Sequence, residues 1–448
     1  MKEGPTTPPG GVPATAARPG EPRPGWEWVE RTVWTDRMLD ALERGVQGGK
    51  WHSLIDKVWS PGSLAAAWGQ VRRNQGSPGA DGVRIELFER QEEQNLADLH
   101  ESLRNGAYRP GVILRKHIPK PGKPGETRPL GIPGVRDRVV QTALRNVLEP
   151  IFEREFAEHS YGFRPGRGAK DALRRVKALI REGYTHVVDA DLKAYFDTIP
   201  HEPLMEQVRE RVADRKVLDL LKALLRQPVL DGEQRTVPEQ GTPQGSVISP
   251  LLANLYLTPL DRLAVREGFE MVRYADDFVI LCRSSEEAQQ ALETVQGWTA
   301  SVGLTLHPDK TRLAHLEEGE FFDFLGYRFR DRRANVSPKS QSRFKDRIRE
   351  RTPRSSGSSS QKIVAILNRM LSGWFEYFKH GAKTTLERLD TFVRQRLRAI
   401  LWVRSKRRGM PSRHSNHLWP TPFFARLGLV SLAEARAAAI QSARAANR

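Results

Sequence analysis

The sequence of 448 residues contains a single cysteine, Cys282, and this scarcity excludes two classes of protein. One cysteine can form neither an intramolecular disulfide framework nor a cysteine-rich zinc module. No run of 18 or more uninterrupted apolar residues is present, so we expect no membrane partner. Residues 1–25 hold 7 prolines and 5 glycines without an apolar segment, which predicts a disordered tail rather than a signal peptide. A soluble, cytosolic protein is therefore expected.

Acidic residues are also in short supply. The chain has 72 Lys and Arg against 54 Asp and Glu, a net charge of +18. Residues 331–448 hold 26 basic and 7 acidic side chains, so the whole excess lies in the last quarter. Solvated helix surfaces are the alternative explanation for one short basic run. With a net charge of +19, the basic side chains of residues 331–448 repel one another strongly. We therefore interpret these residues as a binding region for a polyanion.

The spacing of apolar residues predicts a mixture of helices and strands. Helices are expected at 34–71, interrupted at Pro61, and at 135–156, 204–225 and 284–302. A further helix is expected after the loop at 74–82, and it should end at about Asn105. Strands are expected at 112–118, 185–192, 271–272, 278–281 and 304–307.

Two adjacent acids occupy the predicted turn of a β-hairpin, in Tyr274-Ala-Asp-Asp277. Neighbouring carboxylates without a basic partner are costly unless a cation neutralises them, although a solvated turn is the alternative for this pair taken alone. Asp191 ends a second apolar strand, so two strands can bring three carboxylates together around two ions. Oxygen ligands suit Mg²⁺ or Mn²⁺, and a pair of such ions supports nucleotidyl transfer.

Seven blocks of sequence resemble, in their order along the chain, the reverse transcriptase/maturases encoded by bacterial group II introns. The resemblance covers roughly residues 30–440. The blocks are Arg128–Pro133, Tyr161–Pro165, Asp191–Ile199, Gly241–Pro250, Tyr274–Asp277, Gly303–Thr311 and Phe324–Tyr327.

The resemblance implies a right-hand polymerase of the α/β (α+β) class. It implies helical fingers, a palm with a small antiparallel sheet, and an all-helical thumb or maturase domain. The expected divisions are a disordered Pro/Gly-rich tail at 1–28, an N-terminal extension and fingers at 29–185, the catalytic palm at 186–330, an RNA-binding thumb/maturase domain at 331–410 and a basic segment at 411–448. The last segment implies at most a short DNA-binding region.

The resemblance also implies roles for single residues of the acidic set. Asp191 and Asp276 would bind both metal ions, with Asp277 completing the catalytic triad and the carbonyl of Leu192 as an additional metal ligand. The expected cofactor is Mg²⁺, as two ions, with Mn²⁺ as a substitute. Asp189 and Asp197 flank Asp191, and local hydrogen bonding is the expected role for both.

The nucleotide-binding residues are implied in the same way. Arg128 is the expected grip on the triphosphate because guanidinium binds phosphate in a bidentate manner, and Lys120 is the weaker candidate. Phe196 would exclude a 2′-hydroxyl, while Gln244 and Gly245 would contact the incoming nucleotide and the template pair.

A further lysine of the same set has several possible roles. Lys310 matches a lysine proposed in the family as a general acid for pyrophosphate, and a plain phosphate contact or a solvated side chain is equally compatible with the sequence.

The block around Trp374 resembles the maturase domain, which grips intron RNA and the template–primer duplex. Its aromatic residues are either base-stacking platforms or helix-packing core, and clustered cations there would contact phosphates. The RNA-binding candidates are Trp374, Arg394, Arg398, Lys406, Arg407 and Arg408.

The expected activity is that of an RNA-directed DNA polymerase. As a maturase, the protein would also bind the intron RNA and promote its splicing. It would support mobility of the intron by target-primed reverse transcription. The expected partners are group II intron RNA, an RNA template with a DNA primer, dNTPs and target DNA. The location is the bacterial cytoplasm, or the nucleoid when DNA is bound. The sequence predicts neither the oligomeric state nor which intron is bound.

Two alternatives stay open. One is a non-enzymatic RNA-binding splicing factor, which the intact acids disfavour; the other is a retron, diversity-generating or host-adopted reverse transcriptase, which the Trp374 block disfavours. Many family members append a His/Cys-rich nuclease of the HNH type. With Cys282 alone we expect none, which points to target insertion at single-stranded or replication-fork DNA.

Overall fold

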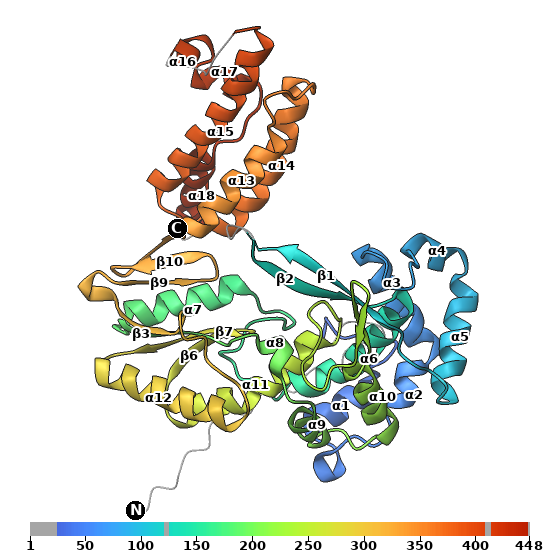
Figure 1. Cartoon of the computed structure of the whole chain (residues 1–448). Coiled ribbons are helices and arrows are strands. Elements are labelled where there is room, and N and C mark those ends of the chain that lie inside the picture. Colours follow the sequence, from blue (N-terminus) through green and yellow to red (C-terminus); the bar gives the residue numbers. More distant parts are fainter. Residues whose placement is uncertain (1–24, 121–124, 408–413, 447–448) are drawn as a thin grey trace, which may run out of the picture.

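The computed structural model of this protein describes residues 25–120, 125–407 and 414–446. Three hydrophobic cores organise these residues. The largest lies among the N-terminal and central helices, the second under the sheet that carries the acidic turn, and the third inside a C-terminal helical bundle (Figure 1).

The N-terminal region is helical, as expected. Its helices are α1 (Asp36–Arg44), α2 (Ile55–Trp59), α3 (Pro61–Asn74), α4 (Ile85–Arg90) and α5 (Glu92–Arg104), with a short 3₁₀ turn, η1 (Gln47–Gly49). Pro61 begins α3 rather than interrupting a helix, because Ser60 caps it and the first helical position needs no N–H donor. The disordered tail was expected to include residues 1–28, but Trp26 and Trp28 pack against the largest core, so its expected end at residue 28 is wrong. Residues 1–24 lie outside the described residues.

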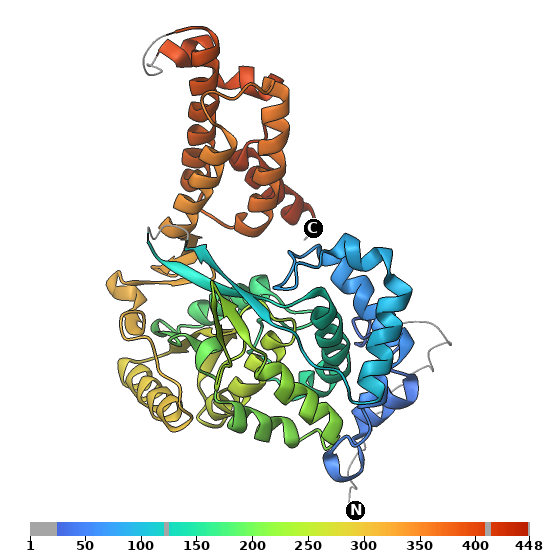
Figure 2. The same ribbon diagram turned by 45° about the vertical axis from the view of Figure 1, so that its right-hand side comes forward.

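A long antiparallel ribbon leads from these helices toward the C-terminal bundle (Figure 2). It consists of β1 (Ile113–Pro119) and β2 (Thr127–Ile132), and β1 also pairs in parallel with β4 (Val229–Asp231), which is followed by β5 (Gln234–Thr236). Beneath the ribbon, the buried Asp137 accepts hydrogen bonds from the Tyr108 hydroxyl (2.7 Å) and the Gln227 amide (2.7 Å). Burial nevertheless raises the pKa of Asp137 above its usual range.

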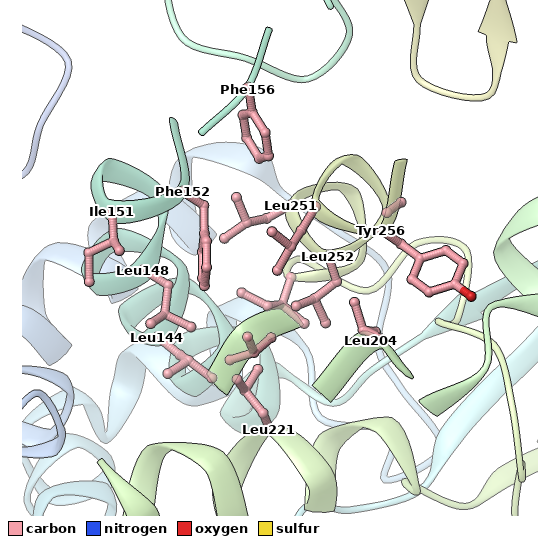
Figure 3. Packing of buried hydrophobic residues seen from close by; sticks show 14 of the residues in the cluster. Leu144, Leu148, Ile151, Phe152, Phe156, Leu204, Leu221, Leu251, Leu252 and Tyr256 are labelled. Atoms are coloured by element: carbon pink, nitrogen blue, oxygen red, sulfur yellow. The ribbon is translucent and has the colours of Figure 1, made fainter. Parts of the chain in front are cut away.

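Four helices meet in the largest core, where their leucines and aromatic residues interdigitate (Figure 3). These helices are α6 (Val135–Glu153), α9 (His201–Arg209), α10 (Arg215–Leu225) and α11 (Ser249–Arg266). Leu144 and Phe152 of α6 lie opposite Leu251 and Leu252 of α11, and all four are buried. This packing supports the second sheet from one side.

The second sheet is antiparallel throughout, with the strand order β6-β7-β3-β8. Its strands are β3 (His186–Asp191), β6 (Glu270–Tyr274), β7 (Asp277–Cys282) and β8 (Arg312–His315). Alternate residues face opposite helices: Val187 and Leu281 join the core of α7 (Ala169–Arg181), whereas Val188 and Ile280 join that of α12 (Ser285–Ser301).

The strand expected at 304–307 is wrong. Only Leu306 forms a bridge there, with Leu192, and β8 begins at Arg312 instead. Pro308 has no N–H for a sheet ladder, and the amides of Lys310 and Thr311 turn back to the carbonyl of His307.

A three-stranded meander joins this sheet to the C-terminal bundle. It comprises β9 (Phe321–Phe324), β10 (Tyr327–Arg330) and β11 (Arg333–Val336), after the 3₁₀ turn η2 (Leu316–Glu318). The bundle holds α13 (Pro338–Arg351), α14 (Ser360–Phe378), α15 (Lys383–Arg404), α16 (His414–Leu418), α17 (Thr421–Arg426) and α18 (Leu432–Ala446). Two tyrosines lock the junction, because the Tyr327 hydroxyl donates to the carbonyl of Tyr377 (2.7 Å) and the Tyr377 hydroxyl donates to that of Leu325 (2.8 Å).

The bundle projects from the rest of the molecule in both views (Figures 1 and 2). The mixed α/β class, with helical N-terminal elements, a small antiparallel sheet and an all-helical C-terminal part, is confirmed. Within the described ranges, no helix combines the length and the apolar composition needed to cross a bilayer.

Candidate active site

The two predicted acidic segments meet at one end of the β6-β7-β3-β8 sheet. Asp191 is the direct register partner of Asp277, and Tyr274 pairs with Asp277 across the hairpin, so Ala275 and Asp276 form a two-residue turn. Ala275 adopts a φ of 59°, the left-handed conformation that tight hairpin turns require. The structure therefore brings Asp191, Asp276 and Asp277 together, as the sequence predicts.

The carboxylates repel one another strongly in this position. Burial, followed by the charges of Asp189, Asp191 and Asp276, raises the pKa of Asp277 to about 8. Burial also raises the pKa of Asp276, to which Asp191 contributes. No set of three or more His, Cys, Asp or Glu side chains in the described ranges already has a metal-binding arrangement. The concentration of buried carboxylate oxygens nevertheless fits a hard divalent cation, which would remove their repulsion.

Lys310 reaches this acidic set through the segment that follows α12. The amide of His307 donates to the carbonyl of Asp191 (2.7 Å), and the amide of Lys193 donates to that of Thr305 (2.8 Å). These main-chain bonds place Lys310 so that its ammonium group forms an ion pair with the Asp191 carboxylate.

Asp189 has a hydrogen-bonding partner on the neighbouring strand, whereas the local hydrogen bonding expected for Asp197 stays a prediction. Asp189 faces Arg312 across the β3–β8 register, with 3.5 Å between the guanidinium and carboxylate, and burial raises its pKa to about 6. Burial also raises the pKa of Asp197, and Arg115 and Arg128 oppose that rise.

A buried ion pair behind the turn was not found from the sequence. Arg273 and Asp261 are both 0% exposed and form a two-point contact, with Nε–Oδ1 at 2.7 Å and Nη2–Oδ2 at 2.5 Å. The remaining nitrogen, Nη1, donates to Asn254 (3.0 Å) and to the carbonyl of Ala275 (3.0 Å). Arg273 therefore holds the acidic turn from inside the protein. A lone arginine directly after the apolar pair Met271–Val272, within a predicted strand, was the available signal.

The predicted nucleotide-binding residues of the β1–β2 ribbon and the 241–250 segment lie side by side. Nε of Arg128 donates to the Gln244 side chain (2.7 Å), and the amide of Gly131 donates to the Gln244 carbonyl (2.6 Å). Gly245 has a φ of 106°, and a Cβ there would lie 2.4 Å from the carbonyl oxygen of Gly131. Glycine is thus required where the two backbones touch. Lys120 forms an ion pair with Glu126 (3.1 Å) on the same ribbon.

Phe196 lies at the start of α8 (Tyr195–Thr198), directly after Asp191 and the Leu192–Ala194 turn. Its side chain is 7% exposed and packs in the largest core. The neighbouring Tyr195 is fixed by a hydrogen bond from its hydroxyl to the carbonyl of Ala253 (2.5 Å). The carbonyl of Phe196 accepts from the amide of Thr242 (2.6 Å), which ties α8 to the segment that carries Gln244.

The RNA-binding candidates of the bundle divide into two groups. Arg398 is only 6% exposed: its Nε donates to the carbonyl of Trp419 (3.0 Å) and its guanidinium lies 5.3 Å from the Phe424 ring, and this burial disfavours the RNA contact predicted for it. Trp374 stacks on Phe344 at 4.2 Å, which makes it helix-packing core rather than a base-stacking platform.

The other candidates are more accessible. Arg394 is half-buried and donates to Thr391 (3.1 Å), whereas Lys406 and Arg407 are exposed near the end of α15. Arg408 lies outside the described residues.

Comparison with known proteins gives two matches to protein families. Residues 118–329 match the reverse transcriptases (RNA-dependent DNA polymerases), and residues 341–419 match the maturase-specific domain of group II introns. The first match contains all three acids of the turn and β3, and the second contains the larger part of the bundle.

Relatives are found in bacteria, fungi and plants. Protein YkfC of Escherichia coli (strain K12) is 34% identical over 316 residues, which cover 61% of this chain and 82% of YkfC. The group II intron-encoded protein LtrA of Lactococcus lactis subsp. cremoris is 37% identical over 176 residues, 39% of this chain and 29% of LtrA. Nuclear intron maturase 2, mitochondrial, of Arabidopsis thaliana is 30% identical over 217 residues, 40% of this chain and 29% of that protein.

The chain thus spans most of YkfC but less than a third of the other two proteins. The order of a reverse transcriptase domain and a maturase-specific domain, together with the similarity to YkfC over most of its length, shows that this chain belongs to the reverse transcriptase/maturase family of group II introns.

Proposed function

We propose that this protein synthesises DNA on an RNA template by two-metal nucleotidyl transfer, with Asp191, Asp276 and Asp277 as the catalytic residues. The observation that carries the proposal is the register of Asp191 against Asp277 beside the turn that holds Asp276. Reverse transcriptases in general use divalent ions, and here we propose two Mg²⁺, replaceable by Mn²⁺, held by these carboxylates and the carbonyl of Leu192. When bound, such ions activate the primer 3′-hydroxyl and stabilise the leaving pyrophosphate.

The surrounding side chains would position the nucleotide. Nε of Arg128 is used for Gln244, which leaves the two terminal nitrogens of its guanidinium for a bidentate contact with the triphosphate. Lys120 and Lys310 are further cations for the phosphates, and Lys310 would exchange its contact with Asp191 for one with the substrate. Phe196, held firmly by α8, would close the space needed by a 2′-hydroxyl.

The bundle would supply the second activity, which is binding of the intron RNA to promote splicing and of the template–primer duplex during synthesis. Its exposed cations support this proposal, among them Lys406 and Arg407 just after α15, and the half-buried Arg394 is a further candidate. We propose the boundaries 29–185, 186–330 and 331–410 for the fingers, palm and thumb, with residues 411–448 as a short DNA-binding segment. Target DNA, and mobility by target-primed synthesis, complete the proposal.

The decisive experiment is the double substitution Asp276→Ala/Asp277→Ala. Mg²⁺-dependent cDNA synthesis on an RNA template with a DNA primer should fall at least ~10³-fold, because several kcal/mol of charge stabilisation are lost. The melting temperature should stay equal or rise, because the substitutions remove two buried carboxyl groups; burial, followed by the charges of Asp189, Asp191 and Asp276, raises the pKa of Asp277 to about 8. The matched control is Glu92→Ala/Glu93→Ala, an adjacent acidic pair at the first turn of α5, which should leave synthesis unchanged. Full synthesis by the Asp276→Ala/Asp277→Ala variant would refute the proposal.

The same variant tests the alternative of a non-enzymatic splicing factor. Because the acids and the bundle are separate, intron splicing should persist in the Asp276→Ala/Asp277→Ala protein while synthesis stops. If the wild-type protein promotes splicing and makes no cDNA, the splicing factor is the correct assignment.

A further inference from the structure

Two consecutive residues of α11, Ala253 and Asn254, are bonded to both of the chain segments that carry the acidic set. The carbonyl of Ala253 accepts the hydrogen bond from the hydroxyl of Tyr195 (2.5 Å), at the start of α8. The side chain of Asn254 accepts from Arg273 (3.0 Å), and the same nitrogen of Arg273 donates to the carbonyl of Ala275 in the turn (3.0 Å). The reaction proposed above assigns no role to either of these contacts with α11.

The sheet ladder alone does not fix the two acidic segments. Asp191 and Asp277 form the last register pair between β3 and β7, so the chain beyond each of them leaves this ladder. Ala194 and Ala275 then adopt left-handed φ angles of 50° and 59°, which are unfavourable for residues with a Cβ. Such conformations persist only where the surrounding structure imposes them. The contacts with α11 supply that support on both sides.

The polar groups at this step of α11 are almost fully enclosed. Asn254 is 1% exposed and Tyr195 is 2% exposed. Burial raises the pKa of the Tyr195 hydroxyl well above its usual range, so the hydroxyl remains a hydrogen-bond donor. Arg273 and Asp276 also act on this pKa, with opposite signs, which places the ring close to the turn. Because a buried polar group without its partner is costly, these bonds hold a defined geometry.

Asn254 also joins the turn to the loop that precedes α7. Its amide donates to the carbonyl of Gly162 (2.7 Å), while its oxygen accepts from Arg273, so both ends of the side chain are used. A Cβ on Gly162 would lie 2.4 Å from the amide nitrogen of Ala275, which shows that the loop backbone touches the turn. Asn254 therefore fixes two neighbours of the turn at once.

We propose that Tyr195 and Asn254 are positioning residues, which set how the Asp191 carboxylate lies relative to the acidic turn and thereby determine the affinity for divalent ions. This inference rests on the proposed function, in which the carboxylates hold these ions. Neither side chain would touch an ion or the substrate, because both are buried and each acts through another group. In metal sites, groups that orient the ligands from outside typically change metal affinity by about 10–100-fold when they are removed.

Two buried tyrosines provide a matched test. Tyr195→Phe removes only the hydroxyl that reaches α11. The control is Tyr256→Phe, because Tyr256 is 1% exposed and its hydroxyl donates to the carbonyl of Val302 (2.7 Å), in a bond that involves neither acidic segment. Binding of Mn²⁺ to the full chain would be measured by electron paramagnetic resonance, and that of Mg²⁺ by competition. The Asp276→Ala/Asp277→Ala protein identifies ions that are bound elsewhere.

For Tyr195→Phe we expect a Kd for Mn²⁺ at the acidic set about tenfold higher than that of the wild type. The Kd for Mg²⁺ should rise further, because Mg²⁺ demands a nearly ideal octahedral arrangement, so cDNA synthesis in Mg²⁺ should fall relative to that in Mn²⁺. Tyr256→Phe should lower the melting temperature by a similar amount, since each variant loses one buried hydrogen bond, but it should keep the wild-type Kd for both ions.

A second pair of variants tests the side chain on α11 itself. Asn254→Leu nearly keeps the size of the side chain and removes both of its hydrogen bonds, so the same rise in Kd is expected. Its control is Thr258→Val, which removes a buried hydroxyl that donates to the main-chain carbonyl of Asn254 (3.1 Å) and should leave both Kd values unchanged. If Asn254→Leu does not fold, the two tyrosine variants decide the question.

Two results would overturn the inference. One is a wild-type Kd for both ions in Tyr195→Phe, and the other is an equal rise in Tyr256→Phe, which would assign the effect to a general loss of stability. A wild-type protein that binds the ions at the acidic set without making cDNA would refute the proposed function, while the Kd comparison would still decide the role of Tyr195.

Discussion

Behind the acidic turn the ion pair between Arg273 and Asp261 is buried, whereas most of the cations of α13 lie at the surface of the bundle. Arg273 and Asp261 are fully enclosed, while Arg343 and Arg347 of α13 are exposed. Buried ions must have partners because their desolvation is costly, and this requirement fixes their geometry. Exposed cations have no such requirement and are free to neutralise phosphates of varied position. The buried ion pair therefore fixes the local structure, whereas the exposed arginines are available to determine the affinity for nucleic acid.

The largest expected effect comes from breaking the buried pair. Arg273→Met leaves Asp261 charged without its partner and should lower the free energy of unfolding by about 3–5 kcal/mol. Urea denaturation measures this change, and Arg347→Met on the bundle is the control, with an expected change within about 0.5 kcal/mol. Arg273→Met/Asp261→Leu should recover most of the stability but not the synthesis, since the carbonyl of Ala275 still lacks its donor. Equal unfolding curves for the two single variants would contradict the comparison.

Two arginines, Arg398 in α15 and Arg407 just after the end of that helix, allow a sharper comparison. Arg398→Gln should lower stability by about 1–3 kcal/mol, because it leaves the half-buried carbonyl of Trp419 without that donor. Once folded, this variant should bind intron RNA with the wild-type salt dependence.

Arg407→Gln should behave in the opposite way. Its guanidinium lies over the Trp402 ring at 5.2 Å on the surface, so stability should change little. The slope of log K against log salt for intron RNA should decrease by about 0.7–0.9, the loss of one phosphate contact. An unchanged slope would show that Arg407 does not contact RNA.

The smallest effect concerns the buried acid beneath the β1–β2 ribbon. Because burial raises the pKa of Asp137 in the folded state, the fold favours its protonated form. Its contribution to stability is fully present below the unfolded pKa of about 3.9 and is lost as the pH rises through the folded pKa. The stability of the wild type relative to Asp137→Asn should therefore decrease from pH 4 upward in denaturation series. A constant difference would show that Asp137 has the same pKa in both states.

The sequence predicted those features whose signal is local. The apolar runs that became β3 and β7, and the acidic turn between β6 and β7, follow from periodicity and turn chemistry. The acids themselves came from their position at strand ends and from resemblance to a family.

Features that depend on distant contacts were missed or wrong. Arg273 acquires its role from Asp261 on another element, and Arg398 is buried because α17 and the carbonyl of Trp419 cover it. The strand expected at 304–307 became a single bridge because its partner, the chain after Asp191, turns into α8. Periodicity reports whether a side chain faces the interior, but it does not report which other segment meets it there.

The crossed hydrogen bonds of Tyr327 and Tyr377 give the junction a mechanical role. The Tyr327 hydroxyl of β10 donates to a main-chain carbonyl of α14, and the Tyr377 hydroxyl of α14 donates to a main-chain carbonyl of the β9–β10 turn. A movement of α14 would therefore also move β10 and that turn. The meander leans on β3 and β7, the strands that end in Asp191 and begin with Asp277. A displacement of the bundle would therefore be transmitted through these two hydrogen bonds to the meander, which contacts the strands that carry Asp191 and Asp277.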